Sequence, residues 1–131
     1  MLSTTDDLRI RELKELSTPE EVMREVPRTL TATRVVMAAR NAIHAILGGQ
    51  DDRLLVVVGP CSVHDPRAAL DYAERLARLR EDLADQLEIV MRVYFEKPRT
   101  TVGWKGLIND PNLDGSFDIN KGLRLARNVL S

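Results

Sequence analysis

The pattern of apolar and polar positions predicts a strand that runs into a sharp turn and then a helix. Residues 54–58 are Leu-Leu-Val-Val-Val, a run typical of a strand buried on both faces in a parallel sheet. Gly-Pro at 59–60 ends this strand, because Pro offers no N–H to a ladder. Asp-Pro at 65–66 suits the N-cap and first residue of a helix. The turn between them presents Cys61, the chain's single cysteine, at the carboxyl end of the strand, where α/β proteins place their chemistry.

The same pattern predicts a second strand and several amphipathic helices. The second strand covers about residues 87–94, and helices are expected after Thr18, after the 29–31 region, from Pro66 and from about Asp118. A strand, a helix and another strand predict a parallel, right-handed βαβ unit. Two strands cannot cover so many amphipathic helices. The pattern therefore predicts the opening of a larger alternating α/β fold, in a polypeptide that is incomplete.

Composition and charge narrow the classes of function. Nineteen basic and twenty acidic residues give a net charge of −1, so no overall field favours nucleic acid or a membrane, and any anion binding must be local. No apolar run approaches the roughly 20 residues of a membrane span. A single cysteine cannot form an internal disulfide, which fits a reducing, cytoplasmic location.

Three features are candidates for chemistry, and each has an ordinary alternative. Cys61 is either a small buried apolar residue or a functional thiol. Its place after Gly-Pro at the end of a strand favours the functional thiol. Arg92 shares a strand face with Val90 and needs a partner, which is either a structural salt bridge or an anionic ligand. The segment 96–106 has two cations around a Pro, then two hydroxyls and glycines. It is either a basic surface loop or a cradle for phosphate, with moderate support for a phosphorylated substrate.

Two blocks of sequence carry a resemblance to a known family. Residues 59–65, Gly-Pro-Cys-Ser-Val-His-Asp, and residues 91–111, which include Lys-Pro-Arg-Thr-Thr-Val-Gly-Trp-Lys-Gly, closely resemble the class I 3-deoxy-D-arabino-heptulosonate 7-phosphate (DAHP) synthases. The resemblance runs along essentially the whole chain. It implies a TIM (β/α)₈ barrel that is incomplete in this chain. Residues 1–50 would form an N-terminal arm and helical extension, and residues 51–131 the first two βα units with a long substrate loop.

The resemblance also implies an activity and a set of site residues. The family condenses phosphoenolpyruvate with erythrose 4-phosphate, the first step of the shikimate pathway to aromatic amino acids. A divalent metal (Mn, Fe, Co or Zn) is held there by a Cys that Cys61 matches, and the other ligands, a His, a Glu and an Asp, lie beyond residue 131. Arg92 matches the arginine that binds the phosphoenolpyruvate carboxylate. Lys97, Pro98, Arg99 and Thr100 match the family's loop that binds the aldose. In the family, the Lys of this loop lies near the reacting groups, and its Arg and Thr hold the aldose phosphate.

The N-terminal extension of the family implies regulation and assembly. Asp6 and Asp7 match acidic residues of the family's N-terminal extension. That extension contributes to oligomer contacts and to a feedback site for an aromatic amino acid. A complete enzyme would therefore be a homo-oligomer. The alternative for this arm is a solvated terminus. Two other functions stay open: a non-catalytic fragment that at most binds a partner chain or anions, and a 3-deoxy-octulosonate 8-phosphate synthase. The Trp-Lys-Gly-Leu block at 104–107 argues against the latter.

Overall fold

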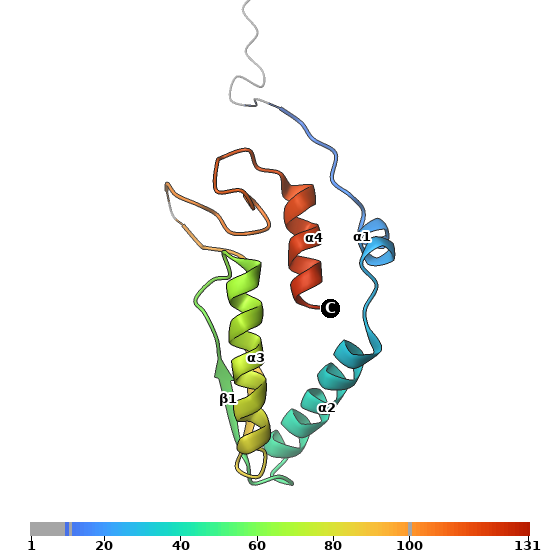
Figure 1. Ribbon diagram of the computed structural model, residues 1–131, viewed down its shortest axis with the longest axis vertical. Helices are drawn as coiled ribbons and strands as arrows, with labels where there is room; N and C mark the ends of the chain where they lie inside the picture. Colours follow the sequence, from blue (N-terminus) through green and yellow to red (C-terminus); the bar gives the residue numbers. More distant parts are fainter. Residues whose placement is uncertain (1–9, 11, 100) are drawn as a thin grey trace, which may run out of the picture.

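A computed structural model describes residue 10, residues 12–99 and residues 101–131. It is an α/β protein of two strands and four helices, which agrees with the predicted class. Figure 1 shows α4 standing between α3 and α1, with α2 leading down to the start of the sheet. Along the chain the elements are α1 (Pro19–Glu25), α2 (Leu30–Leu47), β1 (Leu54–Val58), α3 (Pro66–Asp82), β2 (Leu87–Met91) and α4 (Ile119–Val129).

The helix starts form where the sequence predicts them, because side-chain caps satisfy the first backbone N–H groups. Thr18 makes a capping box with Glu21, in which the Thr18 N–H donates to the Glu21 carboxylate at 2.8 Å. Thr29 caps α2, and Asp65 caps α3 by accepting from the Arg67 N–H at 2.8 Å. Local sequence therefore sets these boundaries.

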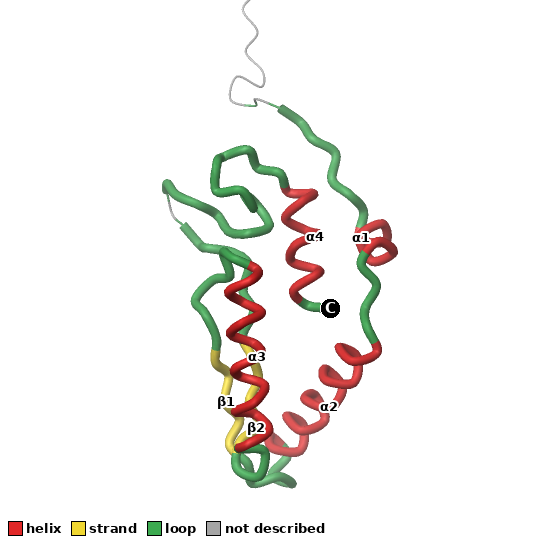
Figure 2. The backbone as a smooth tube through the Cα atoms, in the orientation of Figure 1, coloured by secondary structure: helices red, strands yellow, loops and turns green. Residues whose placement is uncertain are grey.

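The two strands pair in parallel, as predicted, with a register from Leu54 opposite Leu87 to Val58 opposite Met91 (Figure 2). The second strand is shorter than the predicted 87–94. It ends at Met91 because the chain that follows β1 bulges away from it, so regular pairing stops there.

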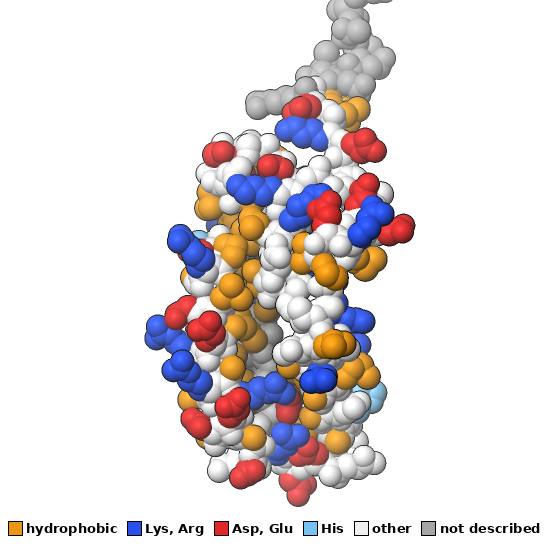
Figure 3. Space-filling model, turned by 45° about the vertical axis from the view of Figure 1, so that its right-hand side comes forward, with side chains coloured by type: hydrophobic (Ala, Val, Ile, Leu, Met, Phe, Trp, Pro, Cys, Tyr) orange, Lys and Arg blue, Asp and Glu red, His pale blue; other side chains and the backbone are white. Residues whose placement is uncertain are grey.

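The prediction that β1 is buried on both faces is wrong for the described residues. Leu54 and Val57 remain 65% and 62% exposed. The physical reason is that β1 has one neighbouring strand, and α3 packs on β2 rather than on β1. Figure 3 shows hydrophobic side chains in a band down the middle of the visible face of the molecule.

The core lies at the carboxyl end of the strands. Val63 and Leu107 are 2% and 1% exposed and pack with Ala69. Partly buried side chains from the long loop and from α4 close around them: Val93, Phe95, Trp104, Leu125 and Val129. The best-packed part of the chain therefore supports the turn after β1 and the loop after β2.

α4 packs against α3 and α1 rather than against a third strand. The Arg124 guanidinium pairs with the Glu25 carboxylate at 2.6 Å and joins α4 to α1. A division of the chain near residue 50 stays a prediction. None of the helices in the described part of the chain is long and apolar enough to cross a membrane.

Candidate active site

The turn after β1 leaves the parallel ladder as a bulge that carries Cys61. The Arg92 N–H donates to the Val58 carbonyl at 2.8 Å, and the next pairing runs from the Val63 N–H to the Tyr94 carbonyl, also at 2.8 Å. The residues between Val58 and Val63 have too few partners on the other strand, so they stand out of the ladder. Cys61 is exposed as a result.

Both ends of this bulge are held in place. A Cβ on Gly59 would collide with the Arg92 carbonyl oxygen and lie 3.1 Å from the Arg92 nitrogen. Only glycine therefore lets the strand end pass this close to its neighbour. At the other end, the Ser62 hydroxyl donates to the Glu96 carbonyl at 3.0 Å, next to the buried Val63.

The loop after β2 folds back on itself from a packed base. The Lys97 N–H donates to the Lys105 carbonyl at 2.9 Å, and the Leu107 N–H to the Phe95 carbonyl at 2.8 Å. Gly106 has a φ of 125°, and a Cβ there would overlap the backbone at Phe95. Because Leu107 is buried in the core, residues 97–99 and 101–105 project from a fixed base.

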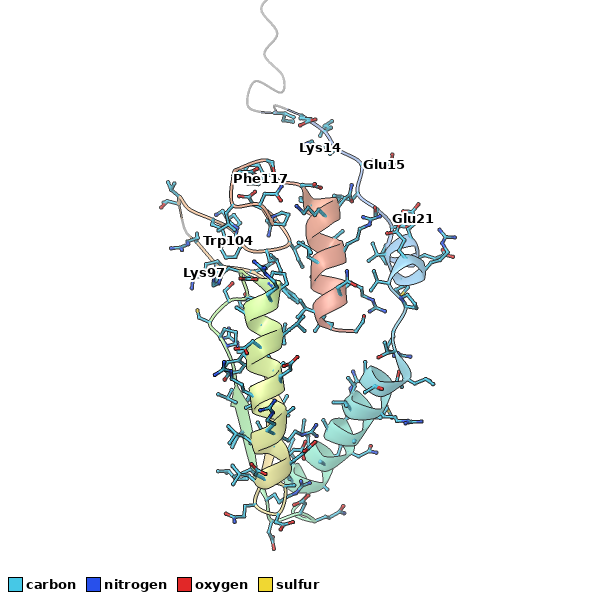
Figure 4. The ribbon with its side chains drawn as sticks, in the orientation of Figure 1. Lys14, Glu15, Glu21, Lys97, Trp104 and Phe117 are labelled. Carbon is cyan, nitrogen blue, oxygen red and sulfur yellow. The ribbon has the colours of Figure 1, made fainter. Side chains whose placement is uncertain are left out.

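Within this loop, Trp104 and Lys105 brace the segment that carries the cations. The Trp104 indole N–H donates to the Asp110 carbonyl at 2.7 Å while the ring packs on the core. The Lys105 ammonium donates to the Arg99 carbonyl at 3.2 Å. Figure 4 places Lys97 and Trp104 together beside the amino-terminal end of α3.

The bulge and the loop bring a thiol and a set of cations together. The Lys97 ammonium donates to the Cys61 sulfur at 3.1 Å. This hydrogen bond and the charge of Lys97 lower the pKa of the Cys61 thiol below its ordinary value, against an opposing effect of burial, and the charges of Arg92 and Arg99 add to the lowering. A cationic, exposed setting of this kind favours the thiolate, which is the nucleophilic and metal-binding form.

The structural salt bridge that was one alternative for Arg92 does not form among the described residues, and its binding of an anion stays a prediction. None of their carboxylates forms a salt bridge with Arg92. Its guanidinium carbon instead lies 5.0 Å from the centre of the Tyr94 ring, a cation–π contact. The side chain is exposed and its N–H groups remain suited to an anion.

The predicted site residues are thus partly assembled. The charges of Lys97, Arg92 and Arg99 all act on the Cys61 thiol, and the exposed Pro98 separates Lys97 from Arg99. Thr100, Asp6 and Asp7 lie outside the residues that the structure describes.

Sequence reasoning missed two kinds of supporting residue. Ser62 and Trp104 hold the two loops in place. The hydrogen bond from Ser62 joins residues 34 positions apart, so no local sequence pattern predicts it. Glu88 is a buried carboxylate in β2, 4% exposed, paired with Arg53 at 3.0 Å and with Arg80 at 2.9 Å. A charged residue inside an apolar strand is the signal that could have found it.

Cys61 fits one position of a metal site. Thiolates are soft ligands for transition metals and zinc, and the Cys61 thiol is exposed and shifted toward its thiolate form. No group of three or more His, Cys, Asp or Glu side chains converges among the described residues. The described part of the chain therefore does not supply a complete set of metal ligands at this site.

The fold and the site define an α/β protein with a cation-lined thiol at the carboxyl end of parallel strands. The chain belongs to the DAHP synthetase I family, whose sequence profile matches residues 25–130.

Individual relatives extend this match over nearly the whole chain. The Phe-sensitive phospho-2-dehydro-3-deoxyheptonate aldolase of Escherichia coli K12 is 66% identical over 125 residues, covering 95% of this chain and 36% of that protein. The Trp-sensitive enzyme of Enterobacter agglomerans is 57% identical, covering 98% and 37%. A solved structure of this aldolase from Francisella tularensis SCHU S4 has a TM-score of 0.87 at 52% identity, covering 92% and 35%. The chain thus spans about a third of the length of these relatives.

Proposed function

We propose that this chain forms the first two βα units of a (β/α)₈ barrel and contributes half of the active site of a DAHP synthase. The reaction would be the metal-dependent condensation of phosphoenolpyruvate with erythrose 4-phosphate. The observation that carries the proposal is the Cys61 thiol held by Lys97 within the field of Arg92 and Arg99. Support comes from the family match and from relatives that are named as phospho-2-dehydro-3-deoxyheptonate aldolases.

The chain's own residues would bind and orient two anions that repel each other. The planar fork of Arg92 suits the carboxylate of phosphoenolpyruvate, and Arg99, with Thr100, suits the phosphate of the aldose. The Lys97 ammonium, 3.1 Å from the Cys61 sulfur, keeps a positive charge beside the reacting groups. Fixed cations on two braced loops would hold the two substrates at reacting distance. Bringing two substrates together accounts for a large part of the activation barrier, so this positioning lowers the barrier.

Cys61 would be one ligand of a divalent metal, with Mn, Fe, Co and Zn as candidates. When bound, such a metal polarises the aldehyde as a Lewis acid. The other ligands of this metal would lie outside this chain. We also infer a cytoplasmic location, because an exposed thiol that must stay reduced suits a reducing compartment.

A chimera tests this proposal. In the Escherichia coli relative, the 125 matched residues are replaced by this chain, and consumption of phosphoenolpyruvate is measured with erythrose 4-phosphate and a divalent metal. We expect turnover that Cys61→Ala abolishes while circular dichroism shows a retained fold. Arg78→Ala, an exposed residue on α3, is the control and should leave the rate unchanged.

The alternative function is a non-catalytic fragment. It is favoured by the lack of a group of three metal donors among the described residues and by α2, in which no described side chain is buried. A folded chimera without turnover, or one in which Cys61→Ala keeps full activity and metal affinity, would support this alternative over the synthase.

The N-terminal arm is proposed to take part in oligomer contacts and in feedback inhibition by an aromatic amino acid, with Asp6 and Asp7 in the inhibitor site. Relatives named Phe-sensitive and Trp-sensitive support regulation of this kind. Deleting residues 1–11 from the active chimera should relieve inhibition and spare catalysis. Inhibition that is unaltered by the deletion would contradict the proposal.

A further inference from the structure

The Arg99 side chain lies against Gly103, further along the same loop. A Cβ placed on Gly103 would lie 3.3 Å from Arg99 Nε and 3.5 Å from Arg99 Cδ. The inner part of the guanidinium group therefore covers the face of Gly103 on which any other residue would carry its side chain. Gly103 also has a φ of 122°, which residues with a Cβ rarely adopt. Both observations make glycine necessary for this arrangement of the loop.

The main chain of Arg99 is held from the base of the loop. The Lys97 N–H donates to the Lys105 carbonyl at 2.9 Å, and Glu96 and Gly106 form an antiparallel bridge beside this pair. The Lys105 ammonium then donates to the Arg99 carbonyl at 3.2 Å. Lys105 thus joins the base of the loop through its backbone and Arg99 through its side chain.

The guanidinium of Arg99 is seated without being paired to a described carboxylate. Arg99 is exposed, and none of the salt bridges in the described part of the chain includes it. An unrestrained arginine on a surface loses much side-chain entropy when a ligand orders it. An arginine that is already seated loses less, so it binds an anion more tightly.

We propose that Gly103 and Lys105 are positioning residues for Arg99. Gly103 leaves the space in which the base of the guanidinium rests, and Lys105 fixes the main chain that carries it. The inference rests on the proposed function, in which Arg99 holds the phosphate of the aldose. Gly103 and Lys105 would set how tightly Arg99 binds that phosphate without contacting it themselves.

Kinetics of the active chimera test these roles. Lys105→Met should raise the Michaelis constant for erythrose 4-phosphate roughly 3- to 10-fold, as expected for the loss of one hydrogen bond. Gly103→Ala should raise it roughly tenfold, because the Cβ strains the backbone and displaces the guanidinium. In both variants kcat and the Michaelis constant for phosphoenolpyruvate should change less than about twofold. Lys105→Arg, which keeps a cationic donor, should restore most of the affinity.

A double-mutant cycle shows whether the effect passes through Arg99. When Arg99 is already alanine, Gly103→Ala and Lys105→Met should have little further effect on the Michaelis constant for erythrose 4-phosphate. The matched control for glycine is Gly49→Ala, at a φ of 68° with no atom within 4 Å of the added Cβ. Lys121→Met, on an exposed residue of α4, is the control for lysine. Both controls should leave the two Michaelis constants unchanged.

The alternative role for Lys105 is a third cation that attracts the phosphate directly. Cleavage by trypsin after Arg99, followed by mass spectrometry without substrates, separates the two roles. Proteolysis requires the loop to open, so a positioning role predicts faster cleavage in Lys105→Met and in Gly103→Ala. Loss of a charge alone would leave the cleavage rate after Arg99 unchanged.

The outcomes distinguish this inference from the proposed function. An active chimera in which both variants keep the Michaelis constant for erythrose 4-phosphate, or in which their effects persist without the Arg99 side chain, overturns the positioning roles and leaves the synthase intact. A folded chimera without turnover overturns the synthase, and the cleavage rate after Arg99 then decides whether the two residues hold Arg99. If circular dichroism shows that Gly103→Ala does not fold, Lys105→Met and its rescue by arginine decide the question.

Discussion

The acidity of Cys61 depends on one side chain more than on any other. Lys97 supplies both the hydrogen bond and the largest charge effect on the thiol, while Arg92 and Arg99 have smaller charge effects. An ammonium next to a sulfur favours S⁻ over S–H, so the pKa of the thiol falls. The two residues are 36 positions apart, and the contact exists only while both loops keep their shape.

This contact predicts how the reactivity of the metal-free chain depends on pH. Only the thiolate reacts with iodoacetamide, so the alkylation rate of Cys61 should rise with pH through a midpoint lower than that of the urea-unfolded chain. Lys97→Met should move the midpoint upward, because the charge that favours the thiolate is gone. Lys121→Met, which removes an exposed ammonium from α4, is the control. Equal midpoints in the Lys97 variant and the unaltered chain would show that the contact does not operate in solution.

Arg99 should distinguish the two substrates. In the active chimera, Arg99→Ala removes a charged, two-pronged contact worth about 1.5–3 kcal/mol. The Michaelis constant for erythrose 4-phosphate should therefore rise roughly 10- to 150-fold, with a much smaller change for phosphoenolpyruvate. Steady-state kinetics with each substrate varied in turn measures both constants. An equal rise in both would assign the loop to the wrong anion.

The loops around the site are held by places where two backbones nearly touch. Glycines stand at these places: Gly59 against Arg92, Gly106 against Phe95, and Gly122 against Ile108. At each of them an added Cβ would overlap main-chain atoms, which cannot rotate away as a side chain can. The third contact seats α4 on the long loop, so it links the helix to the base of the candidate site.

Gly122→Ala tests whether this close packing outweighs helix propensity. Alanine in a helix interior is favoured over glycine by about 1 kcal/mol, which would stabilise α4. Its Cβ, however, would lie 2.7 Å from the Ile108 carbonyl carbon, and overpacking costs about 1–3 kcal/mol or more. We expect a net loss of stability in thermal unfolding, whereas Asn128→Ala on the exposed side of α4 should be neutral or stabilising. A gain from Gly122→Ala would mean that α4 does not sit on the loop.

The chain as a whole is packed unevenly. Around Val63 and Leu107 the loops, α3 and α4 form a small dense core. At the other end, α2 has no buried side chain, and Leu30 and Leu47 are each 76% exposed. An apolar groove runs between α2, α3 and β2, lined by side chains such as Val36, Leu76 and Val90. Surfaces of this kind are unfavourable in water unless something covers them.

We therefore expect the 131-residue chain alone to be loosely folded or prone to aggregate, and inactive as a synthase. Each large apolar side chain left in water forfeits about 1.5–3 kcal/mol, against a typical domain stability of about 5–15 kcal/mol. Thermal unfolding should be broad, and amide exchange should be faster in α2 than in α4. A sharp transition from a soluble monomer, or turnover of phosphoenolpyruvate above background, would contradict this expectation.

Much of the architecture could be predicted before any coordinates. Caps at Thr18 and Asp65, the apolar run of β1 and the parallel pairing all form as expected, and α2 begins within the predicted 29–31 region. Each depends on residues a few positions apart or on the general rule for βαβ units, so local sequence carries enough information. The presence of a thiol and basic residues at one edge of the sheet follows from the same rule, because parallel strands end together.

Other features depend on contacts between distant segments, which no local pattern specifies. The bulge after β1 requires the register against Arg92, and that register puts the Cys61 sulfur within reach of Lys97. The burial of β1 was predicted wrongly because it depends on which elements stand beside the strand, rather than on the strand's own residues. Composition and periodicity therefore give the elements and their chemistry, whereas distances, pKa shifts and burial arise when side chains far apart in the chain share one small volume.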